Sequence, residues 1–252
     1  MPKDFTQFAE AIQANVAQVI IGKADVTELL LVALLTGGHI LLEDVPGIGK
    51  TTLAKAMARS LDCSFSRIQF TPDLLPSDVT GINYYNQKHQ EFEFRPGPVL
   101  SQMLLADEIN RATPRTQSSL LEAMQERQIT VDGETYLLPR PFLVVATQNP
   151  IELEGTFPLP EAQVDRFLMQ LDLGYPNETE EEEILLRYQR DDPMVELQPV
   201  ASADDVLELQ HQAEEIHVSA DVRHYILQVV RATREHEAVD LGVSPRGSLA
   251  LF

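Results

Sequence analysis

The stretch PGIGKT at residues 46–51 has the residue types and spacing of a loop that holds a chain of phosphates. Gly47 and Gly49 allow the backbone to curl, so that its N–H groups can face an anion. An apolar run typical of a strand, 39–43, precedes the stretch, and a segment with helical spacing, 51–61, follows it. The N-terminus of that helix would add partial positive charge. This order predicts a phosphate site, although the segment alone also fits an ordinary glycine-rich turn.

Lys50 and Thr51 close this stretch and could contact a nucleoside triphosphate directly. The ammonium of Lys50 would reach the β- and γ-phosphates, and the hydroxyl of Thr51 would ligate Mg²⁺. The common pattern G-x-x-x-x-G-K-[ST] has a glycine where this chain has Asp44. That first glycine assists the entry of the turn, whereas the residues that contact phosphate are all present. Because an acid beside phosphates is costly, we expect the carboxylate of Asp44 to point away or to find a partner.

Two adjacent acids, Asp107 and Glu108, stand at the end of a second apolar run, 99–107. A carboxylate at a strand end can hold the shell of a magnesium ion, and its neighbour can polarise a water for attack on the γ-phosphate. Acids at strand ends are common by chance. Their position after a phosphate loop, on a strand of the same sheet, favours a site that hydrolyses a nucleotide.

Asn149 follows a third apolar run, 142–147. Ligands of open α/β sheets bind beyond the carboxyl ends of the strands, so this neutral side chain would meet the γ-phosphate and could position the attacking water. The alternative interpretation is an asparagine that forms a turn before Pro150.

Arg166 and Arg246 could neutralise the charge of a transferring phosphoryl group, in their own subunit or in a neighbouring one. Arg166 lies just before an apolar run, 167–173, and Arg246 lies at the start of the last helical segment. The alternative for each is a surface or salt-bridging arginine.

The apolar runs alternate with helical segments, which predicts an α/β fold with a parallel sheet. Near-continuous apolar strands suit a sheet that is covered on both faces. The expected strands are 39–43, 65–70, 99–107, 142–147 and 167–173, and the first expected helices are 4–18, 24–36 and 51–61. Two segments with paired arms interrupt this pattern: 82–98, around a polar turn, and 128–137, around Asp132-Gly133, a strong hairpin signal.

Strand signals stop after the last apolar run. Asn177 and Glu180 have the spacing of a capping box, which predicts the start of a helix. Residues 203–237 are typical of further helices. We therefore expect an α/β core over residues 1–174 and a helical domain over residues 175–252.

The composition narrows the class of protein. Lys+Arg total 19 and Asp+Glu total 39, and the resulting formal charge of −20 disfavours non-specific binding to nucleic acid. Cys63 stands alone, so no internal disulfide can form, and a reducing compartment is the natural setting. No stretch approaches the roughly 20 apolar residues that span a bilayer, and the N-terminal residues lack the pattern of a signal peptide. We expect a cytoplasmic protein without membrane insertion.

In their order along the chain, these motifs resemble the AAA+ ATPases and, within them, the MoxR branch. The words that carry the resemblance are EDVPGIGKT, FTPDLLPSDVTG, EFEFRPGPV, LLADEINRA, LLEAMQERQITVDG, ATQNP and LPEAQVDRF. The resemblance covers roughly residues 5–252. It also makes Asp44 a marker of the branch, in which the loop commonly has the sequence EDVPG. The resemblance implies a P-loop NTPase (AAA+) three-layer sandwich and then a small all-α lid. Because the family's lid continues past Phe252, we expect a truncated lid here.

The resemblance also implies roles for the candidate residues. Lys50 and Thr51 correspond to Walker A, Asp107 and Glu108 to Walker B, Asn149 to sensor 1, Arg166 to the arginine finger and Arg246 to sensor 2. Segment 82–98 corresponds to the helix-2 insert and 128–137 to the pre-sensor-1 hairpin. The implied cofactors are ATP or ADP and Mg²⁺, with the ion on Thr51 and Asp107. The residues expected to contact the nucleotide are Val19, Ile20, Ile21, Gly22, Pro46, Gly47, Ile48, Gly49, Lys50, Thr51, Thr52 and Asp107.

The resemblance finally implies an ATP-hydrolysing chaperone that remodels or assembles protein complexes and can aid metal or cofactor insertion. It implies a ring, typically a hexamer, and a von Willebrand factor A domain protein as partner. An arginine finger given in trans needs a neighbouring subunit, which accords with a ring. The alternatives are a nucleotide-dependent scaffold with little hydrolysis and a chelatase-like motor subunit. The negative charge disfavours a third alternative, a DNA helicase.

Overall fold

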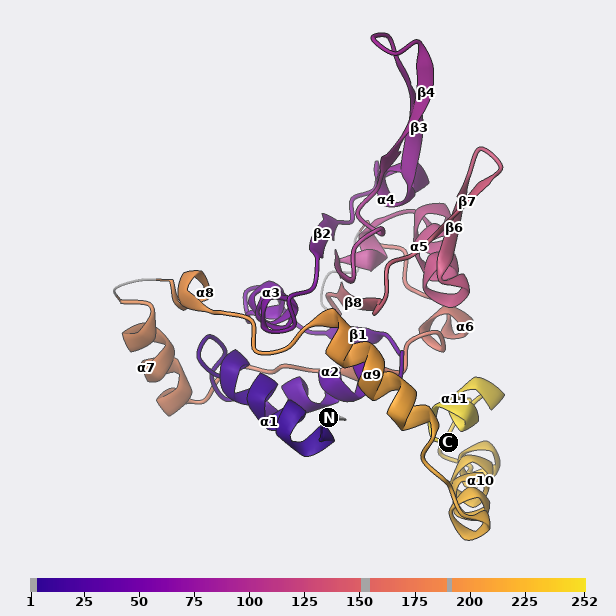
Figure 1. Ribbon diagram of the computed structural model, residues 1–252. Helices are drawn as coiled ribbons and strands as arrows, with labels where there is room; N and C mark the ends of the chain where they lie inside the picture. The colour runs from indigo at the N-terminus through magenta and orange to yellow at the C-terminus, as the bar shows by residue number, and fades with distance from the viewer. Residues whose placement is uncertain (1–3, 151–154, 190–191) are drawn as a thin grey trace.

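The computed structural model describes residues 4–150, 155–189 and 192–252 (Figure 1). Its centre is a parallel sheet of five strands in the order β2-β5-β8-β1-β9. The strands are β1 Ile40–Glu43, β2 Phe65–Gln69, β5 Met103–Asp107, β8 Leu143–Gln148 and β9 Met169–Leu171. All five expected strands are therefore present, and the expected parallel α/β fold is confirmed.

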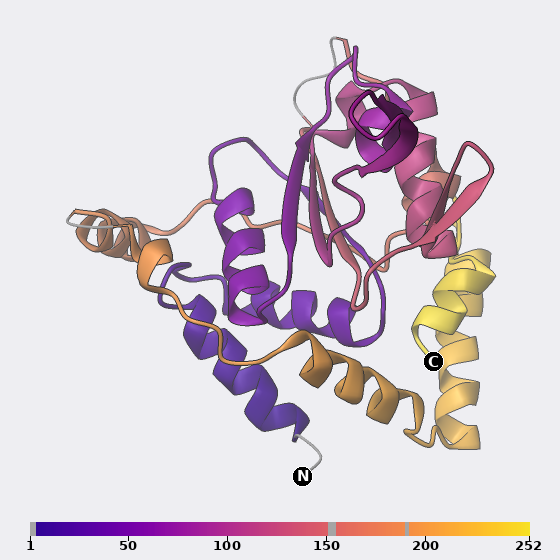
Figure 2. The same ribbon diagram turned by 45° about the horizontal axis from the view of Figure 1, so that its top comes forward.

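Successive side chains of the central strands alternate between two apolar clusters, as the pleat requires. On one face, Ile40 and Leu42 of β1 pack against α1 (Phe5–Val16), α2 (Ala24–Leu35) and α3 (Lys50–Ser60). On the other face, Leu41 packs against α4 (Pro76–Thr80) and α5 (Pro114–Glu126). Helices thus cover both faces of the sheet and form a three-layer sandwich (Figure 2).

Two expected strands are clearly shorter in the structure: the segment 167–173 contains only β9, Met169–Leu171, and the segment 99–107 contains only β5. Residues 99–107 were expected to be extended throughout, but β5 begins only at Met103. Before that point the amide of Val99 donates to the carbonyl of Val79, and the amide of Leu100 donates to that of Gly97. These contacts turn the chain back toward the end of the inserted hairpin, so the buried apolar side chain of Val99 belongs to a turn.

The two inserted segments are hairpins that project from the same side of the sheet (Figure 1). They are β3 (Gly81–Asn86) with β4 (Glu91–Pro96), and β6 (Gln128–Val131) with β7 (Glu134–Leu137). The rings of Phe94 and Tyr136 stack with centroids 4.0 Å apart, and Asn83 Nδ2 donates to Asp132 Oδ2 at 2.9 Å. Stacking and hydrogen bonding therefore join the two hairpins to each other.

The C-terminal part is helical, as expected. Its helices are α7 Glu178–Arg187, α8 Pro193–Glu196, α9 Ala203–Glu214, α10 Ala220–Glu235 and α11 Pro245–Ala250. Asn177 and Glu180 form the expected capping box at the start of α7. Val206 and Leu209 of α9 are fully buried in the same cluster as α1, α2 and α3, whereas α10 and α11 extend beyond the sheet (Figure 1). Among the described residues no helix is long and apolar enough to cross a membrane.

Candidate nucleotide site

The glycine-rich loop lies between the carboxyl end of β1 and the first turn of α3. Gly47 has φ 88° and Gly49 has φ 95°, a left-handed backbone conformation that glycine adopts without strain. Gly49 is the N-cap of α3, which begins at Lys50. The N–H groups at this helix end are available to an anion, so the local geometry is that of a phosphate loop.

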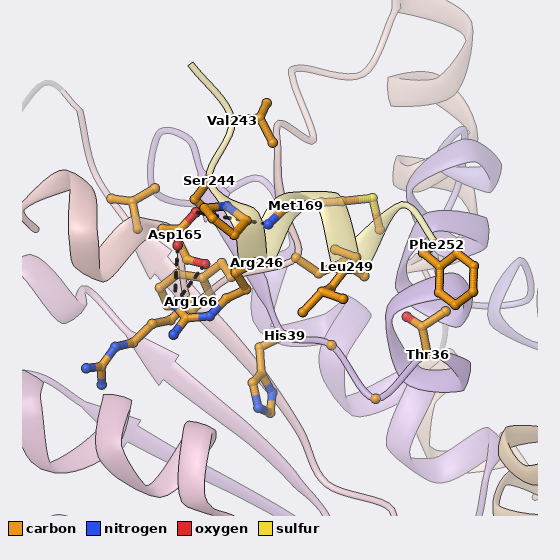
Figure 3. Close-up of a pocket in the computed structure, with 18 of the residues that line it drawn as sticks. Thr36, His39, Asp165, Arg166, Met169, Val243, Ser244, Arg246, Leu249 and Phe252 are labelled. Atoms are coloured by element: carbon orange, nitrogen blue, oxygen red, sulfur yellow. Dashed lines mark hydrogen bonds and ion pairs between the residues drawn. The ribbon is translucent and has the colours of Figure 1, made fainter. Parts of the chain in front are cut away.

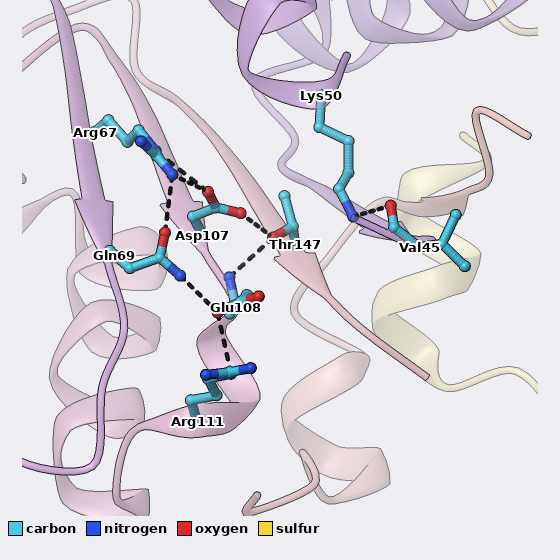
Figure 4. A network of polar contacts seen from close by, with 8 residues as sticks. All are labelled: Val45, Lys50, Arg67, Gln69, Asp107, Glu108, Arg111 and Thr147. Atoms are coloured by element: carbon cyan, nitrogen blue, oxygen red, sulfur yellow. Dashed lines mark hydrogen bonds and ion pairs between the residues drawn. The ribbon is translucent and has the colours of Figure 1, made fainter. Parts of the chain in front are cut away.

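Lys50 reaches back over this loop (Figure 4). Its Nζ donates to the carbonyl oxygens of Asp44 at 2.7 Å and of Val45 at 3.2 Å. Burial lowers the pKa of Lys50 from its ordinary value, and the carboxylates of Asp107, Asp44 and Glu108 oppose this shift. The ammonium therefore lies within electrostatic reach of all three acids, and phosphate oxygens could replace the two carbonyls that it now contacts.

The carboxylate of Asp44 has partners of its own. Its Oδ1 accepts from the amide of Val45 at 2.8 Å, and its Oδ2 accepts from the amide of Gly174 at 2.7 Å. The second of these bonds fastens the loop to the segment that follows β9. Two backbone donors thus satisfy the expectation that an acid at this position finds a partner.

Asp107 is the last residue of β5 and is hydrogen-bonded on both oxygens. Oδ1 accepts from the hydroxyl of Thr147 on β8 at 2.7 Å, and Oδ2 accepts from Arg67 Nη2 on β2 at 2.7 Å. Partners on both flanking strands fix this carboxylate in the plane of the sheet. Together with the hydroxyl of Thr51 it offers hard oxygen ligands, the donor type that Mg²⁺ prefers.

Glu108 follows directly and takes a left-handed conformation, with φ 55° and ψ 50°. It caps a short 3₁₀ helix, η1 (Ile109–Arg111), and its amide donates to Thr147 Oγ1 at 2.8 Å. Its Oε2 accepts from Gln69 Nε2 at 2.6 Å and pairs with Arg111 Nε at 3.0 Å (Figure 4). The carboxylate is therefore held toward β2 and η1.

Asn149 lies one residue beyond β8 and is largely buried. Because β8 runs between β5 and β1, its end lies between the acid pair and the phosphate loop. The amide of Asp44 donates to the carbonyl of Gln148 at 3.2 Å, which brings this strand end against the start of the loop. Lys50, Asp107, Glu108 and Asn149 thus meet at the carboxyl edge of three adjacent strands.

The segment 19–22, expected to contact adenine, connects α1 to α2. Val19 and Ile21 are buried in the structure, whereas Ile20 is half-buried and Gly22 is exposed. Gly22 has φ 71°, and the carboxylate of Glu180 occupies the space that a Cβ at this position would need. The contact of this segment with a base stays a prediction.

The two arginines lie together at another part of the molecule (Figure 3). Arg166 follows α6 (Glu161–Val164), and Arg246 lies in the first turn of α11. Arg246 Nη1 contacts Asp165 Oδ2 at 3.3 Å, and Ser244 Oγ donates to Asp165 Oδ1 at 2.6 Å.

Both arginines line a cavity of about 1700 Å³ together with His39 and Leu168, which precede β1 and β9. The described lining of this cavity includes no residue of 46–52, because the phosphate loop lies at the opposite end of β1. The structure therefore does not bring Arg166 and Arg246 to the Lys50 of their own chain.

Four residues of the site were not singled out from the sequence: Arg67, Gln69, Arg111 and Thr147. Thr147 could have been noticed as a polar residue at the end of an apolar run. Arg67 and Gln69 are polar residues on an edge strand. Only the strand register, in which Gln69 lies opposite Asp107, shows that they belong to the site. That pairing depends on the strand order, which no local pattern of the sequence determines.

Residues 39–169 match the ATPase family associated with various cellular activities. The chain is 53% identical over 238 residues to the uncharacterized protein YeaC of Bacillus subtilis, and the match covers 94% of this chain and 74% of the relative. It is 46% identical to chaperone MoxR1 of Mycobacterium tuberculosis, over 94% of this chain and 65% of the relative. It is 34% identical to protein MoxR of Methylorubrum extorquens, over 71% and 53%.

A crystal structure from Cytophaga hutchinsonii, described as that of a candidate ATPase, superimposes with a TM-score of 0.89. The two chains are 42% identical, and the match covers 97% of this chain and 78% of the other. The chain thus spans between about half and four fifths of these relatives' lengths. The matched family, the named relatives and the arrangement of loop, acids and strands agree, and the chain belongs to the MoxR family of AAA+ ATPases.

Proposed function

We propose that this chain binds ATP with Mg²⁺ at the phosphate loop and hydrolyses it to ADP and phosphate. One observation carries this proposal: Lys50, Asp107 and Glu108 converge at the carboxyl edge of the sheet, within electrostatic reach of one another. A lysine, a fixed carboxylate and a second, separately held carboxylate are the groups that phosphoryl transfer to water requires. Thr51 and Asp107 would hold Mg²⁺, which would supply positive charge against the negative charge of the phosphates.

Three residues of the chain have separate roles in this reaction. Lys50 leaves the carbonyls of Asp44 and Val45 and places its charge on the phosphates. Glu108 exchanges its contacts with Gln69 and Arg111 for a water, which it orients and from which it draws a proton. Asn149 holds the same water from the neighbouring strand end.

Arg166 serves the site of a neighbouring copy in this proposal, so the active form is a ring, with a hexamer as the expected stoichiometry. The position of Arg166 and Arg246 in a cavity apart from their own phosphate loop supports this assignment. A finger that enters from a neighbour makes hydrolysis depend on assembly. Phosphate release per protomer should therefore rise with protein concentration, whereas a nucleotide-dependent scaffold would assemble without this rise.

The chemical step is tested by Glu108→Gln. The variant should keep its affinity for ATP and lose turnover by about 100-fold or more, because the amide cannot take a proton. Glu122→Gln, an exposed position on α5, is the matched control and should hydrolyse normally. Hydrolysis by Glu108→Gln at the rate of the control would refute the assignment.

The work of hydrolysis would remodel or assemble protein complexes in the cytoplasm, including steps of metal or cofactor insertion. The relative named chaperone MoxR1 supports the chaperone part of this proposal. The joined hairpins are the elements best placed to transmit movement, since they project together from the core (Figure 1). A client with a von Willebrand factor A domain should bind in an ATP-dependent manner, and binding that ignores nucleotide would contradict the proposal.

A further inference from the structure

Gln117 lies in the middle of α5 and is completely buried. Three backbone carbonyls share the two N–H groups of its Nε2, those of Ile109 at 3.2 Å, Ala112 at 3.1 Å and Phe157 at 2.8 Å. The first two belong to the turn that follows Glu108, and the third belongs to the segment that leads to Arg166. The side-chain amide of Gln117 therefore connects the surroundings of Glu108 with the segment that leads to Arg166.

A second contact reinforces this connection. The amide of Phe157 donates to the carbonyl of Asn110 at 2.6 Å. The carbonyl of Phe157 in turn accepts from Gln117. Leu159, two residues further on, and Val164 of α6 pack against the apolar cluster that contains Ile109. Hydrogen bonds thus join η1 to Phe157, and the same apolar cluster holds both η1 and the start and end of the segment from Leu159 to Val164. Arg166 follows two residues after α6.

The turn that Gln117 supports is the one that sets the position of Glu108. Glu108 has a left-handed backbone, which is unfavourable for any residue other than glycine and has to be held by its surroundings. The amide of Arg111 donates to the carbonyl of Glu108 at 2.9 Å and closes the turn. The carbonyls of Ile109 and Ala112 leave the same turn toward Gln117, so they would be buried without a donor if its amide were absent.

The orientation of the amide group follows from its partners. All three neighbours are acceptors, so the NH₂ group must face them and Oε1 must face away. Oε1 is buried and has no hydrogen-bond partner among the described residues. An apolar side chain of similar size would fill the same space without this unpaired oxygen, so packing alone does not account for an amide here.

We propose that Gln117 is a positioning residue that couples the state of Glu108 to the position of Arg166 in the same chain. When Glu108 leaves Gln69 for a bound nucleotide, η1 shifts, and Gln117 carries that shift to Phe157 and along α6. The nucleotide bound at one site then determines where Arg166 of that chain lies relative to the nucleotide site of the next subunit. This inference rests on the proposed hydrolysis with an arginine finger given in trans.

The test uses mixtures of two inactive variants. Glu108→Gln has an intact finger but no base, and Arg166→Ala has an intact base but no finger. Mixed rings should regain hydrolysis, because an Arg166→Ala site then receives its finger from a Glu108→Gln neighbour. If this reference mixture stays inactive while both variants bind ATP, the proposed finger in trans fails, independently of Gln117.

With the reference mixture active, Gln117→Leu is added to the Glu108→Gln subunit, which serves only as finger donor. Recovery should fall at least tenfold, while ATP binding by the donor stays unchanged. Gln117→Met, which also lacks the donor group but has an unbranched side chain, should give the same loss and covers the case that leucine prevents folding. A structural role alone would lower the melting temperature and ATP binding without selectively removing finger donation.

Thr116→Val is the matched control. Thr116 is the preceding residue, is equally buried, and donates to the carbonyl of Leu74 at 2.7 Å, away from Phe157. The Thr116→Val, Glu108→Gln donor should rescue Arg166→Ala as well as the Glu108→Gln donor does. Full rescue by the Gln117→Leu or Gln117→Met donors, or an equal loss with Thr116→Val, would overturn the proposal.

Discussion

Gln69 holds Glu108 away from the phosphate loop: its Nε2 donates to Glu108 Oε2 at 2.6 Å, from the edge strand beside the one that carries the acid pair. Arg67 Nη2 donates to Gln69 Oε1 at 2.9 Å and so orients this amide. A hydrogen bond to a charged group contributes about 1.5–3 kcal/mol when buried and less in a partly exposed place such as this. We expect Gln69→Ala to raise the turnover number several-fold, because Glu108 is freed to face the nucleotide.

The measurement is steady-state phosphate release at saturating ATP, with the affinity for ATP determined separately. Gln87→Ala, in the exposed turn between β3 and β4, is a control that should leave both values unchanged. Lower turnover in Gln69→Ala with normal ATP affinity would show instead that Gln69 supports the active position of Glu108.

His39 predicts a pH dependence of folding stability. It is buried, and its Nδ1 accepts from the amide of Val144 at 3.0 Å, so Nε2 carries the proton and contacts the carbonyl of Met124 at 3.2 Å. Burial above all, and then the charge of Arg127, lowers the pKa of His39 from 6.5 to about 3. Between these two values the unfolded chain binds a proton that the folded chain does not. This residue's contribution is therefore complete above pH 6.5 and is lost progressively as the pH falls toward 3.

His39→Asn should reduce this dependence, since its Oδ1 can still accept from Val144 but cannot titrate. The free energy of unfolding, measured in denaturant from pH 7 to pH 4.5, should then fall less steeply than in the wild type, by up to about 1.4 kcal/mol per pH unit. His224→Asn, on the exposed surface of α10, is the matched control and should keep the wild-type slope. Equal slopes for His39→Asn and the wild type would contradict the prediction.

Much of the fold and of the phosphate site could be predicted from the sequence, because local patterns determine them. Apolar runs identified every strand of the sheet, and Asp132-Gly133 identified the second hairpin. The contacts of Gln69 and Gln117 could not be predicted, since they depend on which elements become neighbours. Each is a single polar side chain within an element, and only the order β2-β5-β8 or the packing of α5 gives it a partner. The boundary expected near residue 174 stays a prediction.

The stack between Phe94 and Tyr136 predicts that the two hairpins are energetically coupled. The rings belong to different hairpins and lie 4.0 Å apart with an interplanar angle of 18°. Such pairs contribute about 0.5–1.5 kcal/mol beyond the burial of their surface. Phe94→Ala should therefore accelerate amide hydrogen exchange in β6 and β7, although the substitution lies in β4. Phe92→Ala is the control, because Phe92 contacts Tyr85 of its own hairpin. Equal exchange of β6 and β7 in both variants would disprove the coupling.

The pairing of Arg246 with Asp165 predicts in which subunit Arg246 acts. Arg246 shares a cavity with Arg166, and the described lining of that cavity lacks the phosphate loop. Arg246→Ala should therefore leave the ATP affinity of dilute protein within about twofold of the wild type, while hydrolysis at concentrations that permit assembly falls at least tenfold. Arg231→Ala, an exposed arginine on α10, is the matched control and should change neither value. A large loss of ATP affinity in dilute Arg246→Ala would place this arginine at the nucleotide of its own chain. Normal hydrolysis by assembled Arg246→Ala would show that Arg246 takes no part in hydrolysis in either subunit.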